Sequence, residues 1–180
     1  MKMLRLRQLG DPVLRAKAKT LTLQQIQSEA TQTLIENIRY TNQQKQYGVG
    51  LAAPQVGVSV ALSVIGIKPT PTRPGLEPFD CVIINPSYEG LGKQVELWEG
   101  CQSAGRGQHT LYAQVPRYKK VHAMWHDETG KLHDEMLNGF VAHVFQHETD
   151  HLNGVLFVDK VRDTKSYMLA REYAKRIVKA

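Results

Sequence analysis

The hydrophobic positions near the start of the chain recur at the spacing of an amphipathic helix. Apolar side chains three or four positions apart, with polar residues between them, are Leu23, Ile26, Ala30, Leu34 and Ile38. Thr22 and Gln25 form a capping-box pattern before this run. We predict one helix that begins after Thr22 and ends by Gly48. Asp11 and Pro12 predict a shorter helix upstream, because Asp caps a helix and Pro is tolerated at its first position.

In the middle of the chain the pattern changes to that of β-strands. Residues 58–65 are rich in β-branched and aliphatic side chains, and residues 82–84 form a short apolar strand that Asn85-Pro86 is expected to stop. Residues 119–136 alternate apolar and polar positions around a turn at 128–130, which predicts a β-hairpin. A loop before the second strand is predicted from four prolines: Pro69, Pro71, Pro74 and Pro78.

Helical spacing returns in the last third of the chain. It runs from Leu137 to Leu152, with Gly154 placed to end the helix, and a last helix is expected from about Ser166 to Lys179. Strands in the middle and helices at both ends predict an α+β fold.

Composition then limits the class of protein. The 180 residues suit one domain, and 42% hydrophobic with 22% charged residues is ordinary globular usage, which excludes a disordered chain. No apolar run approaches the roughly 20 residues of a membrane span. The first ten residues lack the apolar stretch of a secretory signal. We therefore expect a cytoplasmic protein that does not associate with membranes.

The chain is basic and contains two cysteines. Its net charge of +6 favours contact with polyanions or is simply a solvated surface. With 7% aromatic residues and no RNA-binding motif, sequence-specific recognition of nucleic acid, DNA included, is not expected. Cys81 lies in an apolar run and is interpreted as a small buried hydrophobe, whereas Cys101 lies in a turn-like setting. Two cysteines exclude a secreted disulfide framework.

The strongest chemical signal is His-Glu-Thr-Asp-His at residues 147–151. On a helix, His147 and His151 lie on one face about 5–6 Å apart, so both imidazoles can bind one metal ion. Glu148 can reach a bound water without occupying a coordination position. The alternative is a polar helix face with two incidental histidines. Apolar neighbours predict that this helix is buried, and buried histidines and carboxylates need partners, which favours the metal.

Two further segments become informative when they are considered together with residues 147–151. A catalytic metal needs a third protein ligand, and Cys101 can supply a thiolate, although alone it would be interpreted as an inert buried thiol. The segment at 48–55 is Gly-Val-Gly-Leu-Ala-Ala-Pro-Gln. Its two glycines, Gly48 and Gly50, let the backbone approach a ligand closely, and Gln55 can offer an amide N–H to an oxyanion. Alone, this segment is equally well a structural turn.

Together the three segments resemble the signature motifs of peptide deformylases. That family carries Gly-x-Gly-Leu-Ala-Ala-x-Gln, Glu-Gly-Cys-x-Ser and Gln-His-Glu-x-Asp-His, which stand here at residues 48–55, 99–103 and 146–151. Their order and approximate spacing match, and the resemblance covers nearly the whole chain. It implies a single domain, 1–180, with antiparallel β-sheets packed around a central metal-bearing helix, plus N-terminal and C-terminal helices.

The resemblance also implies an activity. The enzyme would remove the formyl group from the N-terminal formyl-methionine of nascent peptides and release formate. One divalent ion would be bound by Cys101, His147 and His151: Fe(II) in cells, with zinc, nickel or cobalt possible in purified protein. Glu148 would take a proton from water and return it to the leaving amine.

Further residues acquire expected roles through the same resemblance. The Gln55 side chain and the Gln102 backbone N–H would stabilise the oxyanion. Arg117 would pair with Glu99 or Asp150 and hold the cysteine turn against the metal helix; the alternative is a plain surface ion pair. Residues expected to border the substrate are Val49, Gly50, Glu99, Phe140, His143 and Val144.

Three departures from the family pattern border the expected substrate groove. Gln102 replaces the commonest Leu, the segment 104–114 is a few residues longer than usual, and His143 replaces an aliphatic residue. Bacterial relatives use a basic C-terminal helix to dock at the ribosome. Here five Lys or Arg between residues 165 and 179 would serve that role, or the helix is simply solvated.

Two alternatives stay open. One is a deformylase-like protein with altered acyl or peptide preference or little turnover. The other is a zincin-type endopeptidase, which shares the His-Glu-x-x-His pattern. Zincins commonly take their third ligand downstream, where this chain offers only the region around Glu172.

Overall fold

The structure is a computed structural model that describes residues 1–45, 48–70 and 74–178. A 3₁₀ turn at Pro12–Arg15 precedes the regular elements. In chain order these are α1 (Leu23–Ile26), α2 (Glu29–Gln43), β1 (Gly50–Ala52), β2 (Leu62–Ile67), β3 (Phe79–Gly100), β4 (Leu111–His126), β5 (Leu132–Asn138), α3 (Gly139–Leu152), β6 (Met168–Leu169) and α4 (Ala170–Tyr173).

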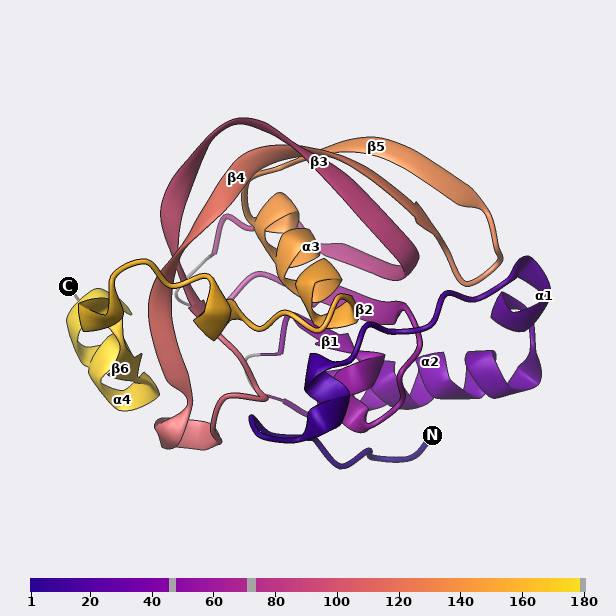
Figure 1. Cartoon of the computed structure of the whole chain (residues 1–180), viewed down its shortest axis with the longest axis horizontal. Coiled ribbons are helices and arrows are strands. Elements are labelled where there is room, and N and C mark those ends of the chain that lie inside the picture. Colours follow the sequence, from indigo (N-terminus) through magenta and orange to yellow (C-terminus); the bar gives the residue numbers. More distant parts are fainter. Residues whose placement is uncertain (46–47, 71–73, 179–180) are drawn as a thin grey trace.

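The described strands form one antiparallel sheet in the order β1-β2-β3-β4-β5, with β6 paired to β4. Figure 1 shows β3, β4 and β5 arching over α3, while α2 lies beside β1 and β2. One apolar cluster joins α2 to the first strands, and another joins α3 to β3, β4 and β5. The predicted α+β fold around a central helix is thereby confirmed. None of the described helices is long and apolar enough to span a membrane.

The strand at residues 82–84 is not stopped by Asn85-Pro86, as the sequence predicted. β3 continues to Gly100, and its pairing with β4 shifts register between Ile84 and Ser87. Asn85 takes a φ of 50°, and its amide donates to the Leu21 carbonyl at 2.7 Å. Proline is tolerated in a strand at such a bulge, because the bulge leaves its position out of the hydrogen-bonded ladder.

The predicted N-terminal helix is divided into two. The capping box of Thr22 and Gln25 forms, but α1 ends at Ile26, and Ser28 caps a second helix. A serine hydroxyl competes for backbone N–H groups, which favours a new helix start over a continuous helix. Leu23 and Ala30 were predicted to lie on the apolar face of the helix, but both side chains are exposed.

Other boundaries moved by a few residues. The strand predicted at 58–65 begins at Leu62, and α3 begins at Gly139 because the two residues before it end β5. The predicted last helix begins at Ala170 instead of Ser166, because Met168 and Leu169 pair with β4. Pro71 and Lys179 lie outside the described residues.

Several predicted features are confirmed. Asp11 caps the Pro12 turn, the hairpin of β4 and β5 forms around residues 127–131, and Gly154 follows α3 with a φ of 72°. A Cβ at Gly154 would lie 2.5 Å from the Arg15 carbonyl oxygen, so only glycine fits there. Gly154 therefore packs the C-terminal end of α3 against the Pro12–Arg15 turn.

Cys81 is partly buried and packs beside the α3 cluster. Burial raises the pKa of its thiol to about 12. The thiol is therefore protonated and unreactive at neutral pH, as expected for a core residue.

Candidate metal centre

Two elements bring the three predicted ligands together. Cys101 directly follows β3, and His147 and His151 lie one turn apart on α3. Their ligand atoms all lie within 4.8 Å of one another, and Cys101 Sγ is 3.2 Å from His151 Nε2. The two imidazole rings are nearly perpendicular, with centroids 4.9 Å apart. Three donors therefore converge on one point from a strand end and a helix face.

The chemistry of this site fits a divalent cation. Glu148 is 2% exposed, and its Oε2 has no hydrogen-bond partner; His151 Nδ1 is likewise buried without one. Buried polar atoms without partners cost free energy and therefore point to a missing group. One thiolate with two imidazoles suits a borderline metal, and three protein ligands leave a coordination position open.

The protonation of Cys101 supports this assignment. Burial works against the thiolate, but the charge of His151 and hydrogen bonds from both histidines outweigh burial and lower the pKa of the thiol to about 5. The backbone N–H of Ser103 also donates to Sγ at 3.4 Å. Cys101 is therefore available as a thiolate ligand near neutral pH.

Glu148 lies beside these residues, but its pKa is raised where that of Cys101 is lowered. Burial raises the pKa of its carboxyl to about 7, although the charges of the neighbouring histidines lower it. A carboxyl with a pKa near the working pH suits a group that both accepts and returns a proton.

Gly50 lies against the side chain of Glu148, which leaves no room for a Cβ at residue 50. A Cβ at residue 50 would lie 2.3 Å from Glu148 Oε1 and 2.7 Å from its carboxyl carbon. Contact of Gly50 with substrate, expected from the sequence, stays a prediction. The structure adds a steric reason for glycine that spacing does not reveal.

Gln55 presents its amide to the cysteine. Its Nε2 donates to Cys101 Sγ at 3.4 Å and to Ser103 Oγ at 3.2 Å, while its Oε1 accepts from the Ala52 N–H at 2.8 Å. The side chain is thereby fixed with its N–H groups toward the metal centre. Sequence reasoning missed Ser103, although it is the last residue of the Glu-Gly-Cys-x-Ser motif.

The Gln102 side chain lies beside Gly48. A Cβ at Gly48 would lie 2.9 Å from Gln102 Nε2, which places that amide beside the glycine-rich segment. The Gln102 carbonyl accepts from Gln8 Nε2 at 2.8 Å. Gln8, also missed by sequence reasoning, thus fixes the backbone next to Cys101.

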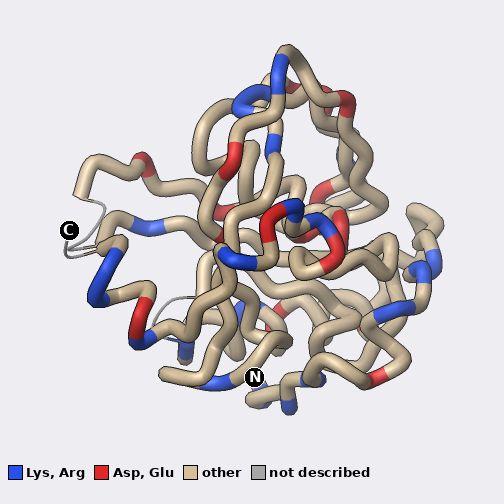
Figure 2. The backbone as a smooth tube through the Cα atoms, turned by 60° about the vertical axis from the view of Figure 1, so that its left-hand side comes forward, with Lys and Arg blue, Asp and Glu red and all other residues tan. Residues whose placement is uncertain are grey.

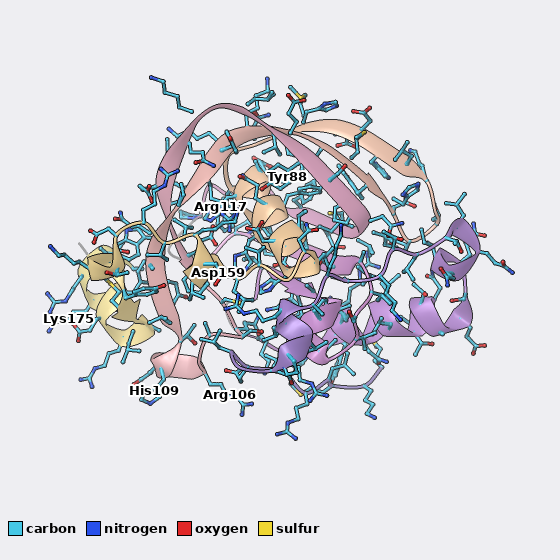
Figure 3. All side chains as sticks on the ribbon, in the orientation of Figure 1. Tyr88, Arg106, His109, Arg117, Asp159 and Lys175 are labelled. Atoms are coloured by element: carbon cyan, nitrogen blue, oxygen red, sulfur yellow. The ribbon has the colours of Figure 1, made fainter. Side chains whose placement is uncertain are left out.

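A buried ionic network supports the ligands. Arg117 is 1% exposed and donates to both oxygens of Glu99, at 2.5 and 3.0 Å, and to Asp150 Oδ2 at 2.5 Å. The structure therefore forms both predicted pairs, and neither is a surface ion pair. Lys160 Nζ lies 3.4 Å from the other oxygen of Asp150. Figure 3 shows Arg117 between α3 and the long strands.

Glu99 connects this network to two histidines of α3. His147 Nδ1 lies 2.8 Å from Glu99 Oε2, and His143 Nε2 lies 2.7 Å from Glu99 Oε1. Burial opposes ionisation, yet the charge of His147 and hydrogen bonds from His143, His147 and Arg117 hold the pKa of Glu99 well below its usual range. A carboxylate on the second nitrogen of a ligating histidine fixes the ring orientation.

Some of the residues expected to border the substrate pack in the apolar cluster around α3, and one of them, His143, contacts Glu99. Val144 is 4% exposed, and Val49 and Phe140 pack against the same α3 cluster. His143 directs its Nε2 to Glu99, as described above, and meets Phe140 edge-on at 5.9 Å. Contact of these residues with substrate stays a prediction.

A buried cysteine and two histidines of α3, beside a buried carboxylate with one unpartnered oxygen, form the arrangement expected of a metal-dependent hydrolase. The family model described as polypeptide deformylase matches residues 3–167. A peptide deformylase 2 from Nostoc sp. is 37% identical over 176 residues, which is 96% of this chain and 93% of that protein. The chain belongs to the polypeptide deformylase family.

Solved structures agree with this assignment. A peptide deformylase from Acinetobacter baumannii bound to Met-Ala-Ser superposes with a TM-score of 0.81 at 28% identity, covering 89% of this chain and 99% of that one. The Thermotoga maritima enzyme superposes with a TM-score of 0.75 at 35% identity, covering 91% and 100%. The chain is thus an enzyme of this family, a metal-dependent hydrolase that removes the N-formyl group from nascent peptides.

Proposed function

We propose that Cys101, His147 and His151 bind one divalent cation and that Glu148 transfers the protons of deformylation. The observation that carries this assignment is the buried Glu148 oxygen without a partner, adjacent to three converging ligand atoms. Fe(II) is the proposed ion in cells, by resemblance to the family. The thiolate and imidazole donors also suit zinc, nickel and cobalt.

The chain's own groups divide the work of amide hydrolysis. When bound, the cation acts as a Lewis acid that lowers the pKa of water to about 7 and polarises a carbonyl. Glu148 accepts a proton from the attacking water and returns it to the leaving amine. The Gln55 amide and the Gln102 backbone N–H donate to the oxygen on which negative charge develops.

The test is formate release by protein purified without oxygen. Formyl-Met-Ala-Ser is the substrate, and metal content is measured on the same sample. We expect about one ion per chain, formate release that a chelator abolishes, and recovery when Fe(II) or Ni(II) is added back. A fully loaded protein that releases no formate would support the alternative of little turnover. Cleavage of internal peptide bonds would support the endopeptidase.

We propose that the C-terminal segment docks on the ribosome. Tyr173 stacks on Tyr112 with ring centroids 4.2 Å apart, which anchors α4 to β4. Arg171 and Lys175 are exposed, and Figure 2 shows basic positions along this segment near the C-terminal label. Arg176 pairs with Glu172 at 2.8 Å, which offsets part of the charge.

The docking test is co-sedimentation with ribosomes at rising salt. Binding through phosphates weakens steeply with salt, because each contact releases counterions. We expect this dependence for the intact chain and loss of binding when Arg171, Lys175 and Arg176 are changed to Gln. Salt-independent binding, or binding that the triple change leaves intact, would contradict the proposal.

Nascent formylated peptides are made in the cytoplasm, and we propose that the chain acts there. We also propose that residues 1–180 work as one domain. The family model spans residues 3–167, and β6 pairs with β4 just beyond that match.

A further inference from the structure

A cavity of ≈300 Å³ adjoins the metal-site loop. Gln102 and Gly105, which follow Cys101, line one side of it, and the N-terminal segment at residues 3–6 lines another. The lining also includes Gly107 and Thr110, and three of its residues are cationic: Arg5, Lys45 and Arg106.

The cavity is built by a specific docking of the N-terminal segment. Arg7 N–H donates to the Gln55 carbonyl and Leu9 N–H to the Ser103 carbonyl, each at 2.7 Å. Gln8 bridges the same loop, because its Nε2 donates to Gln102 O and its Oε1 accepts from Gly105 N–H at 3.2 Å. Arg5 is therefore fixed beside the metal-site loop although it lies far from it in sequence.

Gly105 gives Arg106 its place on the opposite side. Its φ is 103°, and a Cβ there would lie 2.2 Å from the His109 carbonyl oxygen. The loop therefore turns tightly at Gly105 and presents Arg106 toward the N-terminal segment. Figure 3 shows Arg106 and His109 in this part of the loop between β3 and β4.

The positive charge of the cavity is uncompensated. Among the described residues, no carboxylate lines it and none forms an ion pair with Arg5, Lys45 or Arg106. Nearby Arg7, by contrast, lies 3.5 Å from Asp11. A concave site of one sign attracts groups of the other sign, so this cavity fits an anion.

Its position points to the peptide substrate as the source of that anion. Gln102, whose N–H we assign to the oxyanion, also lines the cavity. An extended peptide advances about 3.3 Å per residue, so side chains two to four positions beyond the formyl group reach about 7–13 Å from it. By contrast with the cationic cavity, a second cavity of ≈320 Å³ among β3, β4 and β5 has carboxylates in its lining, which are Glu89, Asp134 and Glu135.

We propose that the cavity of Arg5, Lys45 and Arg106 binds carboxylate side chains of the nascent peptide downstream of formyl-methionine. The enzyme then favours substrates with Asp or Glu at the third and fourth positions. This proposal rests on the proposed function, since it places the peptide's first residue at the metal centre.

The experiment compares three peptides: formyl-Met-Ala-Ser-Ser, formyl-Met-Ala-Asp-Asp and formyl-Met-Ala-Lys-Lys. At low salt we expect the KM of the acidic peptide to be about threefold to tenfold below that of the basic one, with similar kcat, since exposed charge pairs contribute modestly. The difference should shrink as salt rises. In the double variant Arg5→Gln and Arg106→Gln, which keeps only Lys45, the preference should weaken strongly while hydrolysis of the neutral peptide is unchanged.

The matched control is Lys119→Gln with Lys120→Gln, which removes the same charge from exposed positions on β4. This control should keep the acidic preference. Equal KM values for all three peptides, or an equal loss of preference in both double variants, would overturn the inference and leave deformylation intact.

A binding measurement separates this inference from the proposed function. The products Met-Ala-Asp-Asp and Met-Ala-Lys-Lys are titrated into metal-loaded protein by calorimetry, which needs no turnover. Tighter binding of the acidic product, strongly weakened in the Arg5 and Arg106 variant, supports the cavity even if no formate is released. Competition by single-stranded RNA, with no discrimination between the two products, would assign the cavity to nucleic acid and overturn the inference.

Discussion

Gly50 and Glu148 are packed so closely that a side chain at residue 50 would contact the carboxylate of the metal centre. Glu148 is buried, and the space beside its carboxylate is available only because residue 50 has no side chain. The carboxylate and the β1 backbone are therefore in direct contact. The position of the proposed proton-transferring group is therefore limited by a glycine that is not itself a reacting group.

We predict that Gly50→Ala loses activity while retaining metal. The new methyl would displace the Glu148 carboxylate, which lies 2.3 Å from where it would be. General acid–base catalysis is worth about 10²–10⁴-fold, so kcat should fall within that range. Metal content and kcat are measured together. Gly66→Ala is the control, since its Cβ would meet no atom closer than 3.5 Å. Unchanged kcat in Gly50→Ala would refute the steric account.

His143 is predicted to position a metal ligand through Glu99. His143→Leu removes the 2.7 Å contact with Glu99 Oε1, which leaves that carboxylate freer to move against His147. Loss of outer groups around metal ligands costs about 10–100-fold in affinity, and we expect the low end here because Arg117 still binds Glu99. Chelator competition measures this loss. His143→Gln, which retains a donor, should restore part of the affinity; equal affinity in Leu and wild type would contradict the role.

At the scale of elements, the site depends on how β3, β4 and α3 are connected. Arg117 on β4 binds Glu99 on β3 and Asp150 on α3, so one buried side chain links all three. Removing one partner of a buried ion pair leaves an uncompensated charge and is strongly destabilising. The ligand geometry therefore depends on strand register as much as on the helix.

The β4–β5 hairpin carries a pH-dependent contribution to stability. Asp127 Oδ1 accepts from the Thr129 and Lys131 N–H groups at 2.8 and 3.1 Å, and His133 Nε2 lies 2.8 Å from Oδ2. Slight burial opposes the charge, but hydrogen bonds from Thr129 and His133 hold the pKa of Asp127 well below its usual range. The hydrogen bond to Asp127 raises the pKa of His133.

We predict that Asp127→Asn lowers the midpoint of thermal unfolding by about 2–4 °C at most, because exposed pairs contribute little. A lowered Asp pKa stabilises the fold above about pH 4, and this contribution is lost as the pH falls further. A raised His pKa stabilises the fold below about pH 6.5, and this contribution is lost as the pH rises. The difference from wild type should therefore peak at about pH 4–6.5. A difference from wild type that stays constant at all pH values would contradict the account.

For the whole molecule, local patterns predicted the central helix, the hairpin and the pairing of His147 with His151 on one helix face. Period and spacing are properties of neighbouring residues, so His147 and His151 on one helix face follow directly from sequence. That Cys101 joins them depends on the course of β3, which no local pattern encodes. Resemblance to a family, and not hydrophobic periodicity, indicated that Cys101 lies with the two histidines.

The missed features share a physical cause, which is contact between distant segments. Asn85 in the strand through Asn85-Pro86 is hydrogen-bonded to Leu21, and β6 forms because Met168 pairs with Tyr112 of β4. The His143 contact with Glu99 likewise joins positions 44 residues apart. Tertiary contacts of this kind override local propensity.

The central claim is that the metal ligands and the proton-transferring group are different residues of one site. Glu148→Gln tests it most directly, because the amide keeps the size of the carboxylate and cannot accept the proton. Metal content and formate release from formyl-Met-Ala-Ser are measured on one anaerobic preparation, beside Cys101→Ser. We predict that Glu148→Gln retains about one ion per chain and loses at least about 10²-fold in kcat, whereas Cys101→Ser loses the ion. Metal content that falls together with activity in Glu148→Gln, or activity that survives, would contradict the account.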